Sequence, residues 1–273
     1  DQAIYKWAGA DVDYLIENSK DAMILEQSYR IPSAVHELAS RCINQVRSRI
    51  HKAWLPRKQT GLVRWEPSIE LINMEKGDWL VLARTNYLLE QIDDYCRNEG
   101  WFFEVKGRPS ISDTKIKAVL NWQILRKGDS LPLSECVNLL KFIKVRKVNS
   151  LDVLEIDAMM TLADLKERFP ELPDGDWYDA LTSLTPKEVS YIRAMLRRGE
   201  KITKEPRIRL STIHAAKGGE ATNVVLLTDI TNRVYKTYQQ NPDDENRVFY
   251  VGLTRAKENL YLIEPTTTRC FQI

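Results

Sequence analysis

Residues 209–220 read Arg-Leu-Ser-Thr-Ile-His-Ala-Ala-Lys-Gly-Gly-Glu, and the apolar run Val224-Val225-Leu226-Leu227 follows four positions later. Apolar and polar residues alternate at the start of this stretch, as in a strand, and the apolar run is typical of a buried strand. An open α/β sheet presents side chains to a ligand on a polar, glycine-containing loop of this kind. The glycines allow a close backbone approach, and the Thr, His and Lys side chains offer donors to an anion. An ordinary strand-to-helix turn with polar surface residues is the alternative.

The length and composition of the chain favour a folded cytoplasmic protein with room for two domains. It has 273 residues, of which 43% are hydrophobic and 29% are charged. No apolar run approaches the roughly 20 residues that a membrane-spanning helix needs, and no cationic and apolar leader marks export. We therefore expect no membrane partner. The four cysteines are scattered, as is typical of reduced thiols, and the three histidines lie too far apart to suggest a metal site.

Strand and helix patterns alternate in two parts of the chain. In the first part, strands are predicted at residues 79–83 and 102–105, with a helix between them at residues 87–98. In the last part, the strand pattern returns. This alternation predicts an α/β fold with a parallel, doubly wound sheet. The later strands are predicted at residues 208–212, 224–228 and 260–263.

The middle of the chain, from about residue 114 to residue 199, consists of one helical pattern after another. The last helix has the clearest start, because Thr185 at the N-cap and Glu188 at the third helical position form a capping box around Pro186. A helical block between two strand-rich parts predicts an all-helical insertion into the sheet domain. The predicted helices span residues 115–126, 133–144, 151–159, 163–169, 178–184 and 186–198.

A basic strip runs through residues 41–64, where no Asp or Glu interrupts the positive charges. Such a strip could follow a phosphate backbone. The alternative is a solvated face whose acidic partners come from elsewhere in the fold. The basic residues are Arg41, Arg47, Arg49, Lys52, Arg57, Lys58 and Arg64.

Two further positions combine residue types that suit a nucleotide. Tyr29 and Arg30 are adjacent, so that an aromatic ring for a base lies beside a guanidinium for a phosphate. Arg255 lies between a helical run and the strand at residues 260–263, where an arginine can reach across a cleft and bind a phosphate with two hydrogen bonds. For an arginine at such a junction, an ordinary surface ion pair is the commoner alternative.

Taken together and in order, five motifs resemble the C-terminal half of the superfamily 1A DNA helicases, the UvrD/Rep/PcrA family. They cover nearly the whole chain outside the helical block. The motifs are residues 1–10 (Asp-Gln-Ala-Ile-Tyr-Lys-Trp-Ala-Gly-Ala, motif III), 28–30 (Ser-Tyr-Arg, motif IV), 82–86 (Leu-Ala-Arg-Thr-Asn), 212–220 (motif V) and 250–257 (motif VI).

This resemblance implies a RecA-like, parallel-sheet motor domain of the type called 2A, interrupted by a helical subdomain of the type called 2B. Residues 21–113 and 200–273 would form the motor domain, and residues 114–199 the insertion, which is shorter than usual. Residues 1–20 would be the tail of the first motor domain.

The resemblance also assigns nucleotide-binding roles. Gln2 would sense the γ-phosphate, and Tyr29 would stack on the adenine while Arg30 reaches the γ-phosphate. Glu220 would bind the ribose. Arg255 would be the arginine finger that stabilises the charge of the phosphoryl group in transfer. We therefore expect Gln2, Arg30 and Arg255 to take part in catalysis.

On the DNA side, the family pattern implies that Trp7 and Tyr5 stack on bases of a single strand. Another set of residues would contact the DNA backbone, and His214 belongs to this set rather than acting as a general base. Three positions depart from the family pattern: Gly219 stands where leucine is usual, Ala8 where arginine is common, and Ser28 where asparagine is usual. The backbone contacts would come from Arg84, Asn86, Thr212, His214 and Lys217.

Two parts of the family's ATPase centre have no counterpart in the sequence. The chain contains no G-x-x-x-x-G-K-[ST] phosphate loop and no Asp-Glu pair after a strand. In the family both precede motif III, in the first motor domain. We therefore expect ATP as the cofactor, with the Mg²⁺ ligands in a missing N-terminal half. The chain alone is expected neither to hydrolyse ATP nor to unwind DNA.

The expected function is that of the second motor domain of an ATP-dependent 3′–5′ DNA helicase. Its partners would be single-stranded DNA, duplex DNA and the first motor domain, in the cytoplasm and, in a bacterium, at the nucleoid. Two alternatives remain: a non-catalytic nucleic-acid-binding module that reuses the fold, and the helicase part of a RecB-like helicase–nuclease.

Overall fold

The computed structural model describes the chain except for residues 6–8, 10, 19–22, 24–25, 146–157 and 203. The described residues form two compact units. The first contains Asp1–Tyr95, Phe103–Gly107 and Arg207–Ile273, and the second contains Cys96–Phe102 and Arg108–Pro206. The insertion predicted at residues 114–199 lies within the second unit, which extends beyond it at both ends. Within the described ranges, no helix is long and apolar enough to cross a membrane.

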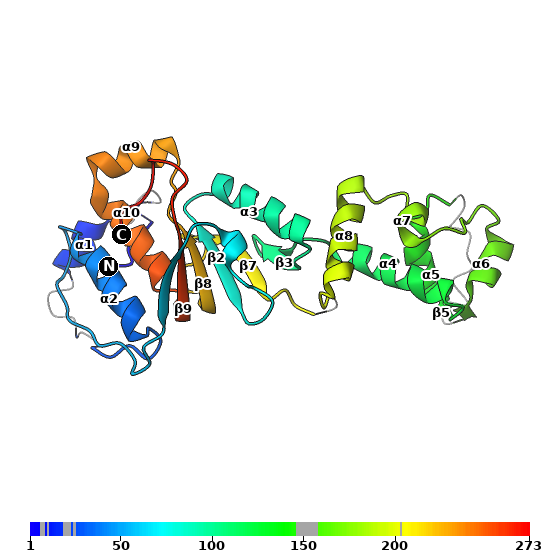
Figure 1. Ribbon diagram of the computed structural model, residues 1–273, viewed down its shortest axis with the longest axis horizontal. Helices are drawn as coiled ribbons and strands as arrows, with labels where there is room; N and C mark the ends of the chain where they lie inside the picture. The colour runs from blue at the N-terminus through cyan, green and yellow to red at the C-terminus, as the bar shows by residue number, and fades with distance from the viewer. Residues whose placement is uncertain (6–8, 10, 19–22, 24–25, 146–157, 203) are drawn as a thin grey trace. The chain divides into compact units, whose positions relative to one another are not determined.

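A parallel sheet organises the first unit (Figure 1). Its strand order is β1-β9-β8-β2-β7-β3. The two-residue strand β4 (Arg108–Pro109) belongs to the second unit. Every neighbouring pair from β1 to β3 in this order is parallel. The predicted parallel α/β sheet is therefore confirmed, and it is consistent with a RecA-like fold. The strands are β1 (Leu62–Glu66), β2 (Trp79–Ala83), β3 (Phe103–Val105), β7 (Ile208–Thr212), β8 (Ala221–Leu227) and β9 (Ala256–Ile263).

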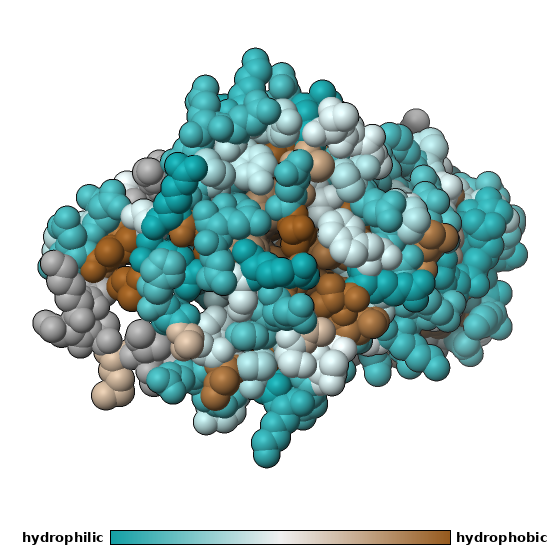
Figure 2. All heavy atoms as spheres, turned by 60° about the vertical axis from the view of Figure 1, so that its left-hand side comes forward, coloured by the Kyte–Doolittle hydropathy of each residue, from teal (hydrophilic) through white to brown (hydrophobic). Residues whose placement is uncertain are grey.

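Helices enclose both faces of this sheet. Leu80, Val224 and Leu260 belong to one buried cluster with apolar residues of α2 (Ser33–Asn44) and α10 (Pro242–Leu253). Helix α3 (Asn86–Glu99) lies on the opposite face (Figure 1). A sheet covered on both faces requires strands that are apolar throughout, and all five residues of β2 are buried. Hydrophilic side chains accordingly predominate on the face drawn in Figure 2, and hydrophobic residues form only local patches there.

Helix α10 is buried along almost its whole length. It packs on α2 and on α9 (Asn232–Gln240). Its Phe249 stacks on Phe271 with the ring centroids 3.9 Å apart. The helix also buries charged side chains, among them Glu245 and Arg247. Because buried charges need partners, each of them fixes the position of another element. Helix α1 (Val12–Glu17) completes the helices of this unit.

The second unit is not all-helical, and that prediction is wrong. Strands β5 (Leu131–Pro132) and β6 (Met159–Met160) pair in an antiparallel ribbon. The helix predicted at residues 151–159 lies outside the described residues except for its last two, of which Met159 belongs to β6. Two further predicted helices are shorter in the structure. The helices are α4 (Asp113–Arg126), α5 (Leu133–Leu140), α6 (Leu162–Arg168), α7 (Trp177–Ala180) and α8 (Pro186–Arg198).

The capping box predicted at the start of α8 is present. The Thr185 hydroxyl accepts a hydrogen bond from the Glu188 backbone N–H at 3.3 Å, and the Glu188 carboxylate accepts one from the Thr185 N–H at 2.9 Å. At the other end, Gly199 closes the helix in the left-handed conformation with φ 74°. Local sequence signals therefore fixed both ends of this helix.

Candidate functional sites at the two edges of the sheet

The parallel strands separate the predicted site residues onto two edges of the sheet. Glu220 directly precedes β8 and Arg255 directly precedes β9, so both lie at the amino edge. Arg84 directly follows β2 and His214 follows β7 by one residue, so both lie at the carboxyl edge. Because β7 and β8 both pair in parallel with β2, the loop of residues 213–220 has to cross from one edge to the other. The stretch that we expected at a single ligand edge therefore reaches both.

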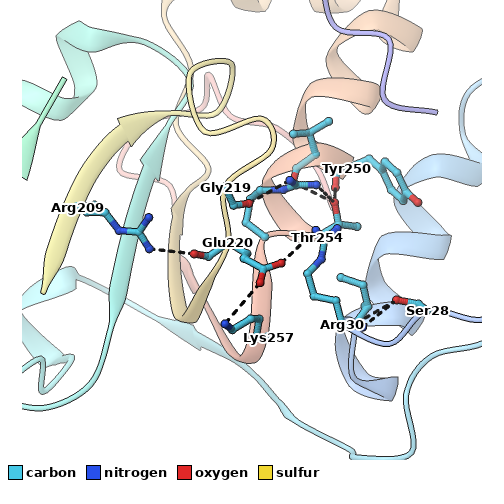
Figure 3. A network of polar contacts seen from close by, with 11 residues as sticks. Ser28, Arg30, Arg209, Gly219, Glu220, Tyr250, Thr254 and Lys257 are labelled. Atoms are coloured by element: carbon cyan, nitrogen blue, oxygen red, sulfur yellow. Dashed lines mark hydrogen bonds and ion pairs between the residues drawn. The ribbon is translucent and has the colours of Figure 1, made fainter. Parts of the chain in front are cut away.

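An ion-pair cluster at the amino edge joins three segments that are distant in sequence (Figure 3). The Arg30 Nη1 lies 3.4 Å from the Glu220 Oε2, and the Lys257 Nζ lies 3.5 Å from the Glu220 Oε1. Ser28 supports the turn before α2, since its Oγ accepts hydrogen bonds from the backbone N–H groups of Arg30 and Ile31. The predicted pair of Arg30 and Glu220 is thus brought together, with Lys257 as a second cation.

Arg255 lies beside this cluster and is 1% exposed. Its Nε donates to the Val251 carbonyl at 2.9 Å, and its Nη1 and Nη2 donate to the Gly219 carbonyl and the Thr254 hydroxyl, each at 3.1 Å. None of the carboxylates in the described part of the chain pairs with it. Burial and the neighbouring Arg30 lower the pKa of Arg255 to about 10, so it stays positively charged at neutral pH. Of the five N–H donors of a guanidinium, two are left for a ligand.

A small polar cavity opens next to the cluster. Its volume is about 170 Å³, and its walls include Gln2, Arg30, Lys52 and Thr254. Two predicted nucleotide ligands, Gln2 and Arg30, therefore share one cavity. Tyr29, by contrast, is 87% exposed and does not line it. The cavity has room for phosphate groups but not for a whole nucleotide, which is consistent with an adenine that stacks outside it.

At the carboxyl edge, Arg84 is held within the fold. Its guanidinium binds the Glu245 carboxylate through two hydrogen bonds: its Nε donates to Oε1 and its Nη2 donates to Oε2 at 3.2 Å. Glu245 is 5% exposed and so has little contact with solvent. Asn86, in contrast, is exposed at the first position of α3. These two predicted DNA contacts therefore have different surroundings.

Tyr5, His214 and Lys217 form a second group at this edge. The Tyr5 hydroxyl donates to the His214 carbonyl at 2.9 Å, and the Lys217 Nζ lies 5.0 Å from the centre of the Tyr5 ring. Burial and the nearby Arg84 lower the pKa of His214 to about 4, so this imidazole is neutral at pH 7. The Thr212 hydroxyl accepts from the Ala215 N–H. Trp7, which was predicted to stack on DNA, lies outside the described residues.

The basic strip of residues 41–64 is partly neutralised by acidic residues from elsewhere in the chain. Arg49 and Lys52 both lie 3.5 Å from the Asp1 carboxylate, and Arg64 pairs with Glu66. For these three residues, the alternative interpretation is therefore correct: acidic residues from elsewhere in the fold pair with them. No role was predicted for Lys52 or for Lys257, although both lie at the amino edge. The signals that could have identified them are the basic strip, which contains Lys52, and motif VI, which ends at Lys257.

The described residues offer no ready metal site, since no group of three or more His, Cys, Asp or Glu side chains among them could hold an ion. The four cysteines are free thiols in the structure. Cys42, Cys96 and Cys136 are buried and Cys270 is half-buried.

Comparison with known proteins shows that the chain is similar to part of several proteins named as DNA helicases. Residues 187–266 match the family model of the UvrD-like helicase C-terminal domain. The probable DNA helicase II homolog of Mycoplasma capricolum is 27% identical over 166 residues, which cover 59% of this chain and 20% of that protein. The probable DNA helicase II homolog of Rickettsia conorii is 22% identical over 370 residues, and DNA helicase II of Rickettsia typhi is 21% identical over 374. Both alignments cover 99% of this chain and 56% of the relative.

The chain thus spans between a fifth and just over half the length of these relatives. The alignment with the Rickettsia conorii protein runs over 370 positions, whereas the chain has 273 residues, so at least 97 of those positions have no residue of this chain opposite them.

Proposed function

We propose that this chain, which matches the UvrD-like helicase C-terminal domain over residues 187–266, is the second motor domain of an ATP-dependent DNA helicase. The whole protein would couple ATP binding and hydrolysis to movement along single-stranded DNA in the 3′–5′ direction, and thereby unwind duplex DNA. Its phosphate-binding loop and Mg²⁺ ligands would belong to the first motor domain. A cytoplasmic location is part of this proposal.

The buried Arg255, which forms no ion pair within the described chain, is the observation that carries the proposal. Its guanidinium is enclosed beside Arg30, hydrogen-bonds only to carbonyl and hydroxyl oxygens, and feels the Glu220 carboxylate without pairing with it. Leaving a cation in this state is unfavourable for folding unless an anion joins it. A transferring phosphoryl group, which gains stabilisation from an arginine at its oxygens, is such an anion. Arg255 is therefore proposed as the arginine finger.

The neighbouring residues fit the other parts of ATP. Arg30 and Gln2 line the polar cavity and would bind the γ-phosphate, while the exposed ring of Tyr29 would stack on the adenine. Glu220 is paired with Arg30 in the absence of a nucleotide. When Arg30 turns to the phosphate, one oxygen of Glu220 becomes free to accept a hydrogen bond from the ribose. ATP, when bound, supplies the phosphoryl group and the free energy for movement.

The link to DNA is proposed to run through the first residues of the chain. Gln2 lines the cavity, and Tyr5, only three residues further on, contacts the loop of residues 213–220 at His214 and Lys217. Trp7 and Tyr5 would stack on bases. Because His214 is neutral, it would contact the DNA backbone through a hydrogen bond and not through charge. Arg84, Asn86, Thr212 and Lys217 complete the proposed contacts.

The second unit is proposed to be a reduced form of the family's 2B subdomain. Its place between β3 and β7 in the chain supports this assignment.

The proposal is tested by replacing Arg255 in the full-length protein that contains this chain. An arginine finger contributes about 10³- to 10⁵-fold to the rate of phosphoryl transfer, so Arg255→Ala should lower DNA-stimulated ATP hydrolysis by at least about 10³-fold. Arg255→Lys keeps the charge but loses the fork of donors, and it should restore little of the rate.

Arg233→Ala is the matched control, because Arg233 is an exposed arginine of α9 away from the cluster. It should leave the rate unchanged. Melting curves establish that each variant is folded. Arg30→Ala repeats the test at a more exposed side chain, whose removal leaves no buried cavity that could destabilise the protein. Near wild-type hydrolysis by folded Arg255→Ala and Arg30→Ala would overturn the proposed function.

A further inference from the structure

We infer that Lys52 is an additional ligand for the terminal phosphate of ATP, an inference that rests on the proposed function. Lys52 lines the same cavity as Gln2 and Arg30. It reaches this cavity from the segment after α2, a part of the chain to which no motif assigns a role. The cavity would therefore receive the phosphate between three elements: the first residues of the chain, the turn before α2 and the segment after α2.

The present partner of Lys52 is already compensated by another residue. The Asp1 carboxylate is 4% exposed and lies 3.5 Å from the Arg49 Nε, which is 3% exposed. The Lys52 Nζ lies 3.5 Å from the second oxygen of the same carboxylate, but its side chain is 38% exposed. The contact between Lys52 and Asp1 is loose, because the Asp1 Oδ2 accepts no hydrogen bond in the described chain. The Lys52 ammonium also keeps contact with solvent, and Arg49 stays beside Asp1 when Lys52 turns to a ligand.

Lysine is suited to such an exchange. Its ammonium group is a compact charge on a flexible stem of four carbons, and it carries three donors. Arg30 and Arg255, by contrast, are restrained by other hydrogen bonds or by burial. Lys52 and Lys257 are the two lysines described at this edge, and of these two Lys52 is the one that lines the cavity and can follow a phosphate as it enters or leaves.

The charge balance around the cavity favours a polyanion. Arg30 and Lys257 share the carboxylate of Glu220, and Arg49 and Lys52 share that of Asp1. Arg255 has no carboxylate partner in the described chain. These five cations outnumber the two carboxylates by three, so the surroundings of the cavity are positively charged and suit a nucleoside polyphosphate.

A purely structural role gives a different expectation. If Lys52 only held Asp1, and with it Gln2, in place, its removal would disturb the site in the same way for every nucleotide. If Lys52 contacts the terminal phosphate directly, its removal should instead weaken the binding of ATP and leave the binding of ADP nearly unchanged. The ratio of the two affinities therefore separates the two roles.

The experiment measures dissociation constants of a non-hydrolysable ATP analogue and of ADP for the full-length protein and its Lys52→Ala, Lys52→Arg and Lys58→Ala variants. One charge-assisted contact corresponds to about a 10- to 100-fold change in affinity. Lys52→Ala should weaken the ATP analogue by about that factor and ADP by less than about 3-fold. Lys52→Arg should recover most of the loss. Lys58→Ala, at an exposed lysine outside the cavity, should change neither constant.

Equal weakening of both nucleotides, or no weakening at all, overturns the role of Lys52. If the wild type binds ATP and Arg255→Ala abolishes hydrolysis while Lys52→Ala binds ATP normally, the inference fails and the proposed function stands. If the wild type binds neither nucleotide, the proposed function fails and the inference fails with it.

Discussion

The ion pair between Arg84 and Glu245 makes a sharp prediction about stability. The two residues are 161 positions apart and join the end of β2 to the first turn of α10. The Glu245 side chain is 6% exposed and that of Arg84 is 20% exposed. Arg84→Ala would therefore leave a carboxylate buried without its partner, and we expect a large loss of stability in the first unit.

The size of this loss follows from the burial of the pair. Two opposite charges about 4 Å apart attract by about 4 kcal/mol at the dielectric constant that suits partly buried sites. Much of this attraction is offset by desolvation, but removing one partner of a buried pair costs about 3–5 kcal/mol. Because Arg84 keeps some contact with water, we take the lower end, about 3 kcal/mol for Arg84→Ala. Glu245→Gln keeps the shape of the side chain and leaves only the charge of Arg84, the more exposed partner, without an opposite charge. This substitution should therefore cost about 2 kcal/mol.

A double-mutant cycle with melting curves measures the pair. For a unit of this size, about 3 kcal/mol corresponds to a fall of about 6–12 °C in the melting temperature. The double variant Arg84→Ala/Glu245→Gln should cost about 3 kcal/mol and not the sum of the single losses, which gives a coupling of about 2 kcal/mol. A fall of less than about 2 °C for Arg84→Ala, or additive losses in the double variant, would refute the reasoning.

Two further predictions concern single residues. The folded-state pKa of His214, about 4, lies below its ordinary value of 6.5, so the unfolded chain binds more protons between these pH values, and the wild type loses stability as the pH falls through this range. The full shift would correspond to about 2 kcal/mol at pH 5, but His214 keeps part of its contact with solvent, so we expect a loss of about 1 kcal/mol. His214→Gln should lack this loss when melting curves at pH 7.5 and pH 5 are compared, and parallel pH profiles for the two proteins would contradict the shift. Gly100→Ala should cost at least about 2 kcal/mol, since its φ is 73° and its new Cβ would lie 2.4 Å from the Ala194 carbonyl carbon. Gly199→Ala, with φ 74° and no atom within 4 Å, is the matched control at about 1 kcal/mol, and equal melting temperatures for the two variants would contradict the steric argument.

The parts of the fold that sequence reasoning predicted are those with a local signal. The apolar run of residues 79–83 coincides with β2, and the capping box at Thr185 coincides with the start of α8. Strands β5 and β6 have two residues each, and so short a segment shows no periodicity. The prediction of an all-helical insertion failed for that reason. The order of strands in the sheet depends on pairing between distant segments, which single residues do not reveal.

The same limit applies to the site residues. The motifs selected Arg30, Glu220 and Arg255, and the structure brings them together at one edge. The motifs did not predict which residues contact each of these side chains. The partner of Arg84 comes from α10, and the cations that join Glu220 and Asp1 include two lysines outside any assigned role. Those contacts arise only when the chain is folded.

Helix α10 connects the two edges of the sheet and explains why their residues depend on one another. Glu245 in its first turn binds Arg84 at the carboxyl edge, whereas Arg255 follows its last turn at the amino edge. At 1.5 Å per residue the helix spans about 18 Å, close to the length of a five-residue strand. Because it is buried along this length, neither end can shift without repacking α2 and the sheet. Arg84 therefore acts first as the anchor of this helix, and the placement of Arg255 depends on that anchor.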